Sequence, residues 1–427
     1  MADIPFPRGV RDLMPNEALF KKTLVSRIEY IFRLFGFLTI DTPSFEALDV
    51  LNAKSAIGGE AKLIYQLSDD KLGLRYDHTV SLARYIAMHN DLPKPFRRYY
   101  VGNVWRREEP QKMRYRELTQ ADVDIVGGNR AMADAEVIAV ASAALENVGV
   151  DYKVCLNDRQ IAESVLGKFG LNQDKKVAVM RIIDKLDKSG EEGIVSMLME
   201  MGLDSSLVDQ IVAFVSMKGS NEEKLSYVEK LMGDNKCTKD IRDTLNFLAD
   251  YGLAGRMSVD YSITRGLDYY TGIVFEFKNA SDARIAIGGG GRYDELIGLY
   301  SNGKSVPAVG VSLGIDRIME MLGASSSIEY TYAKVFVADV KEENYHYALK
   351  VANGLRASAI PTDINIADRN LTNQFAYANS VKSRFVVIVG DAEEKLNKLK
   401  LRDLMSGTEE ILSLDDAIKK IKSEIGG

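Results

Sequence analysis

Residues 98–106 and 116–126 are two strand-like segments that flank a polar loop at residues 108–113. Together they predict a long antiparallel hairpin. Other strand-like segments alternate with stretches of helical periodicity. The predicted strands are 37–42, 64–67, 72–76, 151–156, 257–259 and 274–278, and the predicted helices are 16–35, 79–89 and 131–148. This order predicts an α+β fold with an antiparallel sheet flanked by helices.

Proline and glycine add two local expectations. Pro43 removes a backbone donor, so we expect the strand at residues 37–42 to lie at an edge of the sheet or to end there. The four consecutive glycines at residues 288–291 allow the backbone to pass close to a ligand or to another strand. Residues 309–317 read as a strand that runs into a helix.

The organisation changes twice along the chain. Strand formers, glycine and proline thin out between residues 173 and 253, where repeated helical segments predict a helical insertion. The expected core therefore has two pieces, residues 1–172 and 254–325. Residues 331–427 alternate strand, helix, strand, helix and strand, which predicts a small α/β domain with a parallel core.

Composition excludes several classes of protein. No apolar run reaches 18 residues and the N-terminus lacks a signal or transit pattern, so we expect a cytoplasmic protein without a membrane partner. Two cysteines cannot build a disulfide framework, and a zinc site is not expected. The net charge of -6 argues against a nucleic-acid partner when it is taken alone.

The local distribution of charge, in contrast, favours a polyanionic ligand. Residues 97–116 hold six Arg and one Lys against two Glu, which marks a candidate polyanion site. Alternate strand residues share a face, so we expect Arg106, Glu108, Arg114 and Arg116 to converge on one ligand. Guanidinium groups pair well with phosphate oxygens. The chain has no Walker A sequence, so a nucleotide site must be of another type.

Two further segments suit an amino-acid substrate. Gln120 and Asp124 offer an amide and a carboxylate, while Arg265, Tyr269 and Tyr270 offer a cation and two aromatic hydroxyls. Taken singly, these residues would more often be structural salt bridges or core packing. Together they can hold a zwitterion with a polar ring beside a triphosphate site, which predicts an enzyme that activates an amino acid with ATP.

Five ordered motifs carry a specific resemblance. Residues 42–46 (TPSFE), 96–127 (FRRYYVGNVWRREEPQKMRYRELTQADVDIVG) and 308–318 (AVGVSLGIDRI) resemble motifs 1, 2 and 3 of class II aminoacyl-tRNA synthetases. Residues 265–272 (RGLDYYTG) and 288–298 (GGGGRYDELIG) resemble the two histidine signatures of the histidyl-tRNA synthetase family. The resemblance covers nearly the whole chain and implies the class II antiparallel sheet, a helical insertion and a C-terminal anticodon-binding α/β domain.

The resemblance implies a role for each matching residue. It assigns the binding of L-histidine to Asp77, His78, Thr79, Gln120, Asp124, Arg265, Tyr269 and Tyr270. It assigns ATP to Arg106, Glu108, Arg114 and Arg317, with Mg²⁺ accompanying the nucleotide and no protein metal site. Arg106, Arg265 and Arg317 are then the catalytic arginines. His78 departs from the family pattern, which usually has an apolar residue between Asp77 and Thr79.

The implied reaction joins histidine to the 3′ end of tRNA(His) through histidyl-adenylate. The family is dimeric with motif 1 at the interface, so a homodimer is expected. One alternative is the regulatory subunit of ATP phosphoribosyltransferase, a paralogue on the same fold that usually degrades the signature motifs. A non-catalytic RNA-binding scaffold would have lost the arginines, and a kinase-like enzyme would need motifs that this chain lacks.

Overall fold

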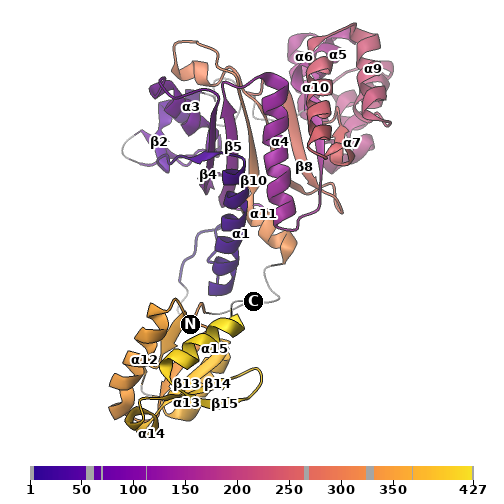
Figure 1. Ribbon diagram of the computed structural model, residues 1–427. Coiled ribbons are helices and arrows are strands. Elements are labelled where there is room, and N and C mark those ends of the chain that lie inside the picture. Colours follow the sequence, from indigo (N-terminus) through magenta and orange to yellow (C-terminus); the bar gives the residue numbers. More distant parts are fainter. Residues whose placement is uncertain are drawn as a thin grey trace. The chain divides into compact units, whose positions relative to one another are not determined.

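The computed structural model describes residues 4–53, 62–68, 71–111, 113–263, 269–323, 331–367 and 369–425. The chain forms two compact units (Figure 1). The larger unit takes the described residues of Met1–Asp12 and Leu19–Ala324. The smaller unit takes those of Leu13–Ala18 and Ser325–Gly427. No described helix is long and apolar enough to cross a membrane.

An eight-stranded sheet organises the larger unit. Its strands lie in the order β1 (Leu38–Thr39), β4 (Phe96–Trp105), β5 (Glu117–Val126), β10 (Ala308–Gly314), β9 (Ala286–Arg292), β8 (Ile273–Asn279), β6 (Tyr152–Asp158) and β7 (Met257–Val259). Neighbours are antiparallel except for the two outer pairs, β1 with β4 and β6 with β7. The expected antiparallel sheet flanked by helices is confirmed, as are the β4–β5 hairpin and the edge position of β1.

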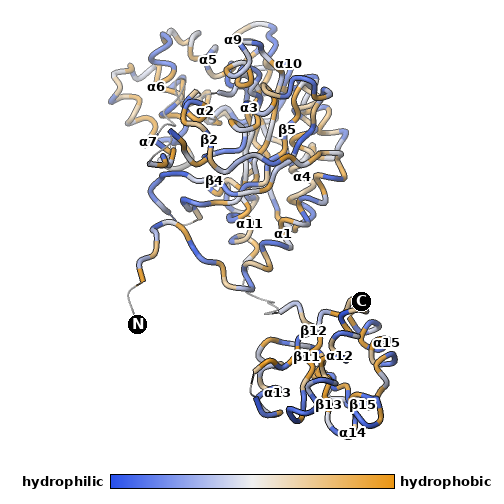
Figure 2. The backbone as a smooth tube through the Cα atoms, turned by 90° about the vertical axis from the view of Figure 1, so that its left-hand side faces the viewer, coloured by the Kyte–Doolittle hydropathy of each residue, from blue (hydrophilic) through white to orange (hydrophobic). Residues whose placement is uncertain are grey.

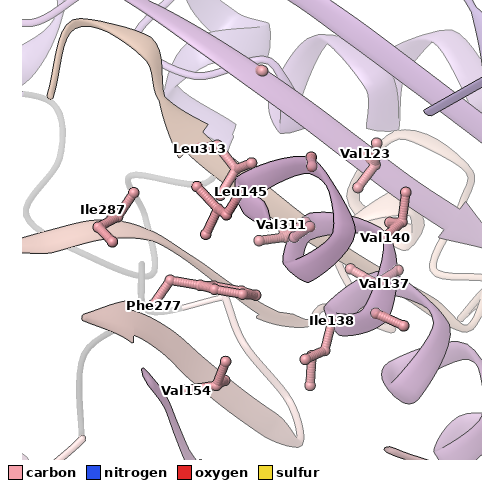
Figure 3. Close-up of a cluster of buried hydrophobic side chains, with 14 of the residues drawn as sticks. Val123, Val137, Ile138, Val140, Leu145, Val154, Phe277, Ile287, Val311 and Leu313 are labelled. Carbon is pink, nitrogen blue, oxygen red and sulfur yellow. The ribbon is translucent and has the colours of Figure 1, made fainter. Parts of the chain in front are cut away.

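Helix α4 (Arg130–Asn147) lies across one face of this sheet (Figures 1 and 3). Its Val137, Ile138, Val140 and Leu145 are buried against sheet residues such as Val311. Burying this face leaves the opposite face of β5 and β10 to carry polar side chains. Helix α1 (Pro15–Leu34) contributes Leu24, Ile28 and Phe32 to the same core. Helices α3 (Thr79–Met88) and α11 (Ile315–Leu322) begin beside the site.

The segment between α1 and α3 differs from the predicted hairpin. Residues 64–67 form no strand, but the antiparallel bridge of Gln66 to Gly73 and two backbone hydrogen bonds, Leu67 N–H to Leu72 O and Leu74 N–H to Tyr65 O, keep them beside residues 72–74. Strand β3 (Leu72–Leu74) also pairs with β2 (Phe45–Ala47), which precedes the short helix α2 (Leu48–Ala53). Periodicity could not reveal this pairing because the partner strand lies far away in the sequence.

The stretch between β6 and β7 is helical, with α5 (Arg159–Lys168), α6 (Gln173–Ile183), α7 (Leu186–Glu200), α8 (Ser205–Val215), α9 (Asn221–Met232) and α10 (Lys236–Asp250), followed by a short 3₁₀ turn at Ala254–Arg256. These helices enclose a hydrophobic core of their own. Helix α10 also packs on α4, and Leu245 contacts both this core and the core of the sheet. Helix α9 lies within the predicted helical insertion at residues 173–253, whereas α5 precedes it and was not predicted.

The smaller unit contains a five-stranded sheet in the order β12 (Thr362–Ile364), β11 (Val335–Asp339), β13 (Phe385–Val389), β14 (Leu399–Asp403) and β15 (Glu409–Leu412). The first three strands are parallel, as predicted, and hydrophobic residues gather on them (Figure 2). Strands β14 and β15 extend the sheet in antiparallel fashion and were not predicted. Helices α12 (Tyr345–Ala357), α13 (Leu371–Ser380), α14 (Asp391–Lys395) and α15 (Leu414–Ile425) complete the unit.

Candidate active site

A cavity of about 260 Å³ opens on the polar face of the larger sheet. Strands β5, β9 and β10 contribute most of its lining, together with the loop between β4 and β5 and the starts of α3 and α11. Of the residues proposed to bind substrates, those that line it are Asp77, Thr79, Arg106, Glu108, Arg114, Gln120, Asp124, Tyr269, Tyr270 and Arg317. The fold therefore brings together residues that lie up to 240 positions apart in the sequence.

Strand β5 presents a row of polar side chains to the cavity. Gln120, Asp122 and Asp124 alternate along the strand and so share one face. They lie opposite Gly314, Ser312 and Gly310 of β10. Gln120 Oε1 is buried and has no hydrogen-bond partner among the described residues, which leaves an acceptor for a ligand.

Asp124 is the most constrained carboxylate of this row. One oxygen lies 2.7 Å from a guanidinium nitrogen of Arg98, and the other accepts a hydrogen bond from the Tyr293 hydroxyl. Burial raises the pKa of Asp124 to about 6, although Arg98 and Tyr293 act in the opposite direction. A Cβ atom on Gly310 would lie 1.9 Å from Asp124 Oδ1. Glycine at position 310 is therefore required for the observed carboxylate position.

Three tyrosines form the wall beside Asp124. The ring centroids of Tyr269 and Tyr270 are 4.6 Å apart, and Tyr269 meets Tyr293 edge-on at 5.9 Å. Burial raises the pKa of Tyr270 above its usual range, so its hydroxyl stays protonated and able to donate at neutral pH. The wall offers hydroxyl donors next to a carboxylate acceptor, which suits a polar ring.

The segment before α3 adds further polar side chains to the cavity, beside the row on β5. Asp77 Oδ1 accepts a hydrogen bond of 2.9 Å from the Val80 amide at the start of the helix. Asp77 and Thr79 line the cavity, but the intervening His78 does not. The His78 ring is directed instead to Asp122, with Nδ1 lying 2.8 Å from Oδ2.

The basic end of the cavity lies around the β4–β5 loop. Arg106 donates to the Tyr76 carbonyl at 3.0 Å, Glu108 pairs with Arg114, and Arg317 donates to the Ala286 carbonyl at 2.6 Å. These contacts hold three guanidinium groups at one side of the cavity, as triphosphate binding requires.

The expected convergence of Arg116 on the same ligand is wrong. Its guanidinium donates to the carbonyls of Glu108 and Arg8 and does not line the cavity. Strand β4 ends at Trp105, so the rule that alternate residues share a face no longer holds in the loop. Met113 has a positive φ of 62° inside this loop, which reverses the chain direction sharply.

The four glycines form part of strand β9, and Gly288 and Gly289 line the cavity. A Cβ on Gly290 would lie 2.0 Å from the Gly310 carbonyl oxygen, and one on Gly288 would lie 2.5 Å from the Ser312 carbonyl oxygen. The predicted close approach is therefore between strands. Without side chains, β9 keeps the cavity open above its backbone.

Sequence reasoning missed several residues of the site. Asp122 and Glu276 line the cavity, and Asp316 binds the Thr119 amide and Arg11, which joins α11 to β5 and to the N-terminal segment. The alternation of residues along β5 was a signal for Asp122. Arg265 lies outside the described residues, so its position relative to the cavity remains a prediction.

The cavity holds carboxylates but no metal cluster. No group of three or more His, Cys, Asp or Glu within the described ranges could hold an ion. Mg²⁺ binds ATP sites through one or two carboxylates together with substrate phosphates, and Glu276 is a lining carboxylate of that kind. The donor set therefore fits an ion that arrives with the nucleotide.

Both units have relatives among known proteins. A family model described as histidyl-tRNA synthetase matches residues 9–318, and one described as an anticodon binding domain matches residues 334–424. The histidine–tRNA ligase of Korarchaeum cryptofilum is 40% identical over 98% of this chain and 99% of its own length. That of Aeropyrum pernix is 36% identical over 97% of each chain. The crystal structure of histidyl-tRNA synthetase from Nostoc sp. PCC 7120 covers 100% of both chains, with a TM-score of 0.85 and 30% identity.

Proposed function

The chain belongs to the histidyl-tRNA synthetase family, and we propose that its cavity activates L-histidine with ATP and passes the histidyl group to tRNA(His). It is thus an aminoacyl-tRNA ligase of class II. The observation that carries the proposal is the fixed position of Asp124, between Arg98 and the tyrosine wall, at one end of a cavity whose other end is basic.

The amino-acid end suits histidine by its donors and acceptors. Asp124 accepts from one imidazole nitrogen, and a hydroxyl of Tyr269 or Tyr270 meets the other. Asp77 and Thr79 bind the α-ammonium group, and Gln120 is a further amide that contacts the amino acid. A site of this kind rejects apolar side chains because its buried polar groups would then have no partners.

The basic end suits the triphosphate and the reacting atoms. Arg106 binds the α-phosphate, Arg317 binds the γ-phosphate side and the adenine, and Glu108 with Arg114 orders the loop over the nucleotide. The histidine carboxylate is already ionised, so it attacks the α-phosphorus in line without a general base and pyrophosphate leaves. Arg106 and Arg265 stabilise the charge that develops on the transferring group. Mg²⁺, when bound with ATP, neutralises phosphate charge.

The second step moves the histidyl group from the adenylate to the terminal ribose hydroxyl of tRNA(His). The smaller unit, which matches an anticodon binding domain, binds the anticodon region of this tRNA. We further propose that the protein acts in the cytoplasm as a homodimer. Leu38 and Phe45, on either side of the motif 1 proline, are 66% and 53% exposed, which supports an interface there. Light scattering after size exclusion that gives only the monomer mass would contradict the dimer.

The first test is ATP–pyrophosphate exchange with each of the twenty amino acids, without tRNA. We expect exchange with histidine alone, because only histidine matches the donors and acceptors at Asp124 and the tyrosines. Exchange with another amino acid would contradict the assignment of the pocket. Folded protein that is silent with all twenty would favour the regulatory paralogue of ATP phosphoribosyltransferase.

A further inference from the structure

A buried pair of hydrogen-bonded side chains, His78 and Asp122, lies at the amino-acid end of the cavity. Nδ1 of His78 is 2.8 Å from Oδ2 of Asp122, and the two side chains are 1% and 4% exposed. The His78 ring also meets Tyr100 edge-on at 4.7 Å. Two ionisable side chains are therefore fixed in one geometry by a hydrogen bond and by packing.

The second oxygen of Asp122 is placed for a ligand. Asp122 lines the cavity, and its Oδ1 is buried without a hydrogen bond of ordinary geometry from the described residues. Burial raises the pKa of this carboxyl, but His78, then Arg98 and the hydroxyl of Ser312 on the facing strand β10, outweigh burial and hold the pKa below its usual range. Asp122 is therefore an anion, and its Oδ1 keeps an acceptor position beside Ser312, because a carboxylate oxygen has two lone pairs. Such a group is costly to bury unless a donor meets it.

The position of the His78–Asp122 pair indicates which group of the substrate donates to Asp122. His78 stands between Asp77 and Thr79, so its bond to Asp122 ties the start of α3 to the middle of β5. Asp124 lies at the other end of the row and is held there by Arg98 and Tyr293. Asp122 thus belongs to the end of the cavity that Asp77 and Thr79 form.

We propose that Asp122 is a further substrate-binding carboxylate, whose Oδ1 accepts a hydrogen bond from the α-ammonium group, and that His78 positions it. This inference rests on the amino-acid site of the proposed function. Charge supports it, because the carboxylates of Asp77 and Asp122 both line the cavity and the ammonium group is a cation. His78 is a positioning residue that does not touch the substrate.

The main test is the isosteric Asp122→Asn variant in ATP–pyrophosphate exchange. Loss of a hydrogen bond to a charged group should raise the KM for histidine about tenfold or more, while the KM for ATP stays the same. Imidazolepropionate, which lacks the ammonium group, should inhibit variant and wild type with similar inhibition constants. Equal weakening of histidine and imidazolepropionate, or no weakening of either, would overturn the proposal.

Two variants of His78 separate positioning from packing. His78→Asn places an amide donor near the position of Nδ1 and should recover most of the histidine KM, whereas His78→Leu should not. Equal effects from both would refute the positioning role. Asp158→Asn changes another buried carboxyl, in a cap of α5, and is the matched control that should leave both KM values unaltered.

Exchange measured with the wild type distinguishes a failure of this inference from a failure of the proposed function. If the wild type exchanges no amino acid, both are overturned. If the wild type exchanges with histidine and Asp122→Asn has the same KM for histidine, only the inference fails.

Discussion

Gly310→Ala tests the geometry of the amino-acid end by adding a single methyl group. Its Cβ would lie 1.9 Å from Asp124 Oδ1 and 2.6 Å from the carboxyl carbon, whereas real Cβ atoms essentially never come within 3.0 Å of another atom. The carboxylate must therefore move by more than 1 Å. The Val123 carbonyl oxygen, at 3.1 Å, leaves the backbone little room to take up this movement.

The displacement should act mainly on histidine. Moving the carboxylate weakens its contacts with Arg98 and Tyr293, and one lost hydrogen bond to a charged group costs about 1.5–3 kcal/mol. A similar loss at the imidazole corresponds to a roughly 10- to 150-fold higher KM for histidine. Overpacking also lowers the stability of the larger unit by about 1–3 kcal/mol. Arg106 and Arg317 lie at the other end of the cavity, so the KM for ATP should not change.

The assay is ATP–pyrophosphate exchange, from which the KM for histidine and the KM for ATP are both determined. Thermal unfolding of each variant is measured alongside. Gly255→Ala is the matched control, because no atom lies within 4 Å of its added Cβ. A Gly310→Ala variant that is folded and keeps the wild-type KM for histidine would refute the assigned role of Asp124. A proportional rise in the KM for ATP would show a general distortion of the cavity instead.

Three other substitutions have defined outcomes. Asp124→Ala should weaken histidine binding and lower discrimination at the ring, and unchanged histidine affinity in calorimetry would contradict this role. Arg265→Ala should slow histidine activation far more than it weakens ATP binding, because its contacts tighten in the transition state, and equal losses in pre-steady-state rate and ATP affinity would exclude that assignment. Burial raises the pKa of Asp158 to about 6, above its usual 3.8, so its stabilising contribution is complete below pH 3.8 and disappears as pH rises through 6. Asp158→Asn should match the wild type near pH 4 and exceed its stability by up to about 3 kcal/mol above pH 7, and denaturation curves that run parallel across this range would disprove the shift.

Local periodicity predicted those parts of the site that lie on regular strands. Gln120 and Asp124 lie within the predicted strand 116–126 and were proposed to bind the substrate, and both line the cavity. The same alternation along the strand applies to Asp122. The resemblance to the family assigns roles only to the residues of its own motifs, and Asp122 is not among them. The contact of Asp122 with His78 spans 44 residues and depends on how α3 packs against the sheet, which spacing alone does not encode.

Prediction failed where pairing is long-range or the backbone leaves a regular element. Residues 72–76 were predicted as a strand, but their partner β2 has only three residues, Phe45–Ala47, which are too few for a pattern that marks a partner. Strands β14 and β15 are short and charged, so their sequences resemble loops; β14 gains hydrogen-bond partners from β13, and β15 gains its partners from β14. Arg116 was misplaced because loop geometry, including the positive φ of Met113, follows no period.

Helix α10 has a consequence for how the larger unit unfolds. Leu245 contacts the core of the sheet and the core of the helices between β6 and β7, so α10 packs against both cores. Unfolding of the helical core would displace α10 and expose apolar surface of α4 to water. The helical segment is inserted in the sequence, but we expect it to be cooperative with the sheet. Amide hydrogen exchange should then give α4 and α10 the same opening free energy, and much faster exchange in α10 would show that the two cores open independently.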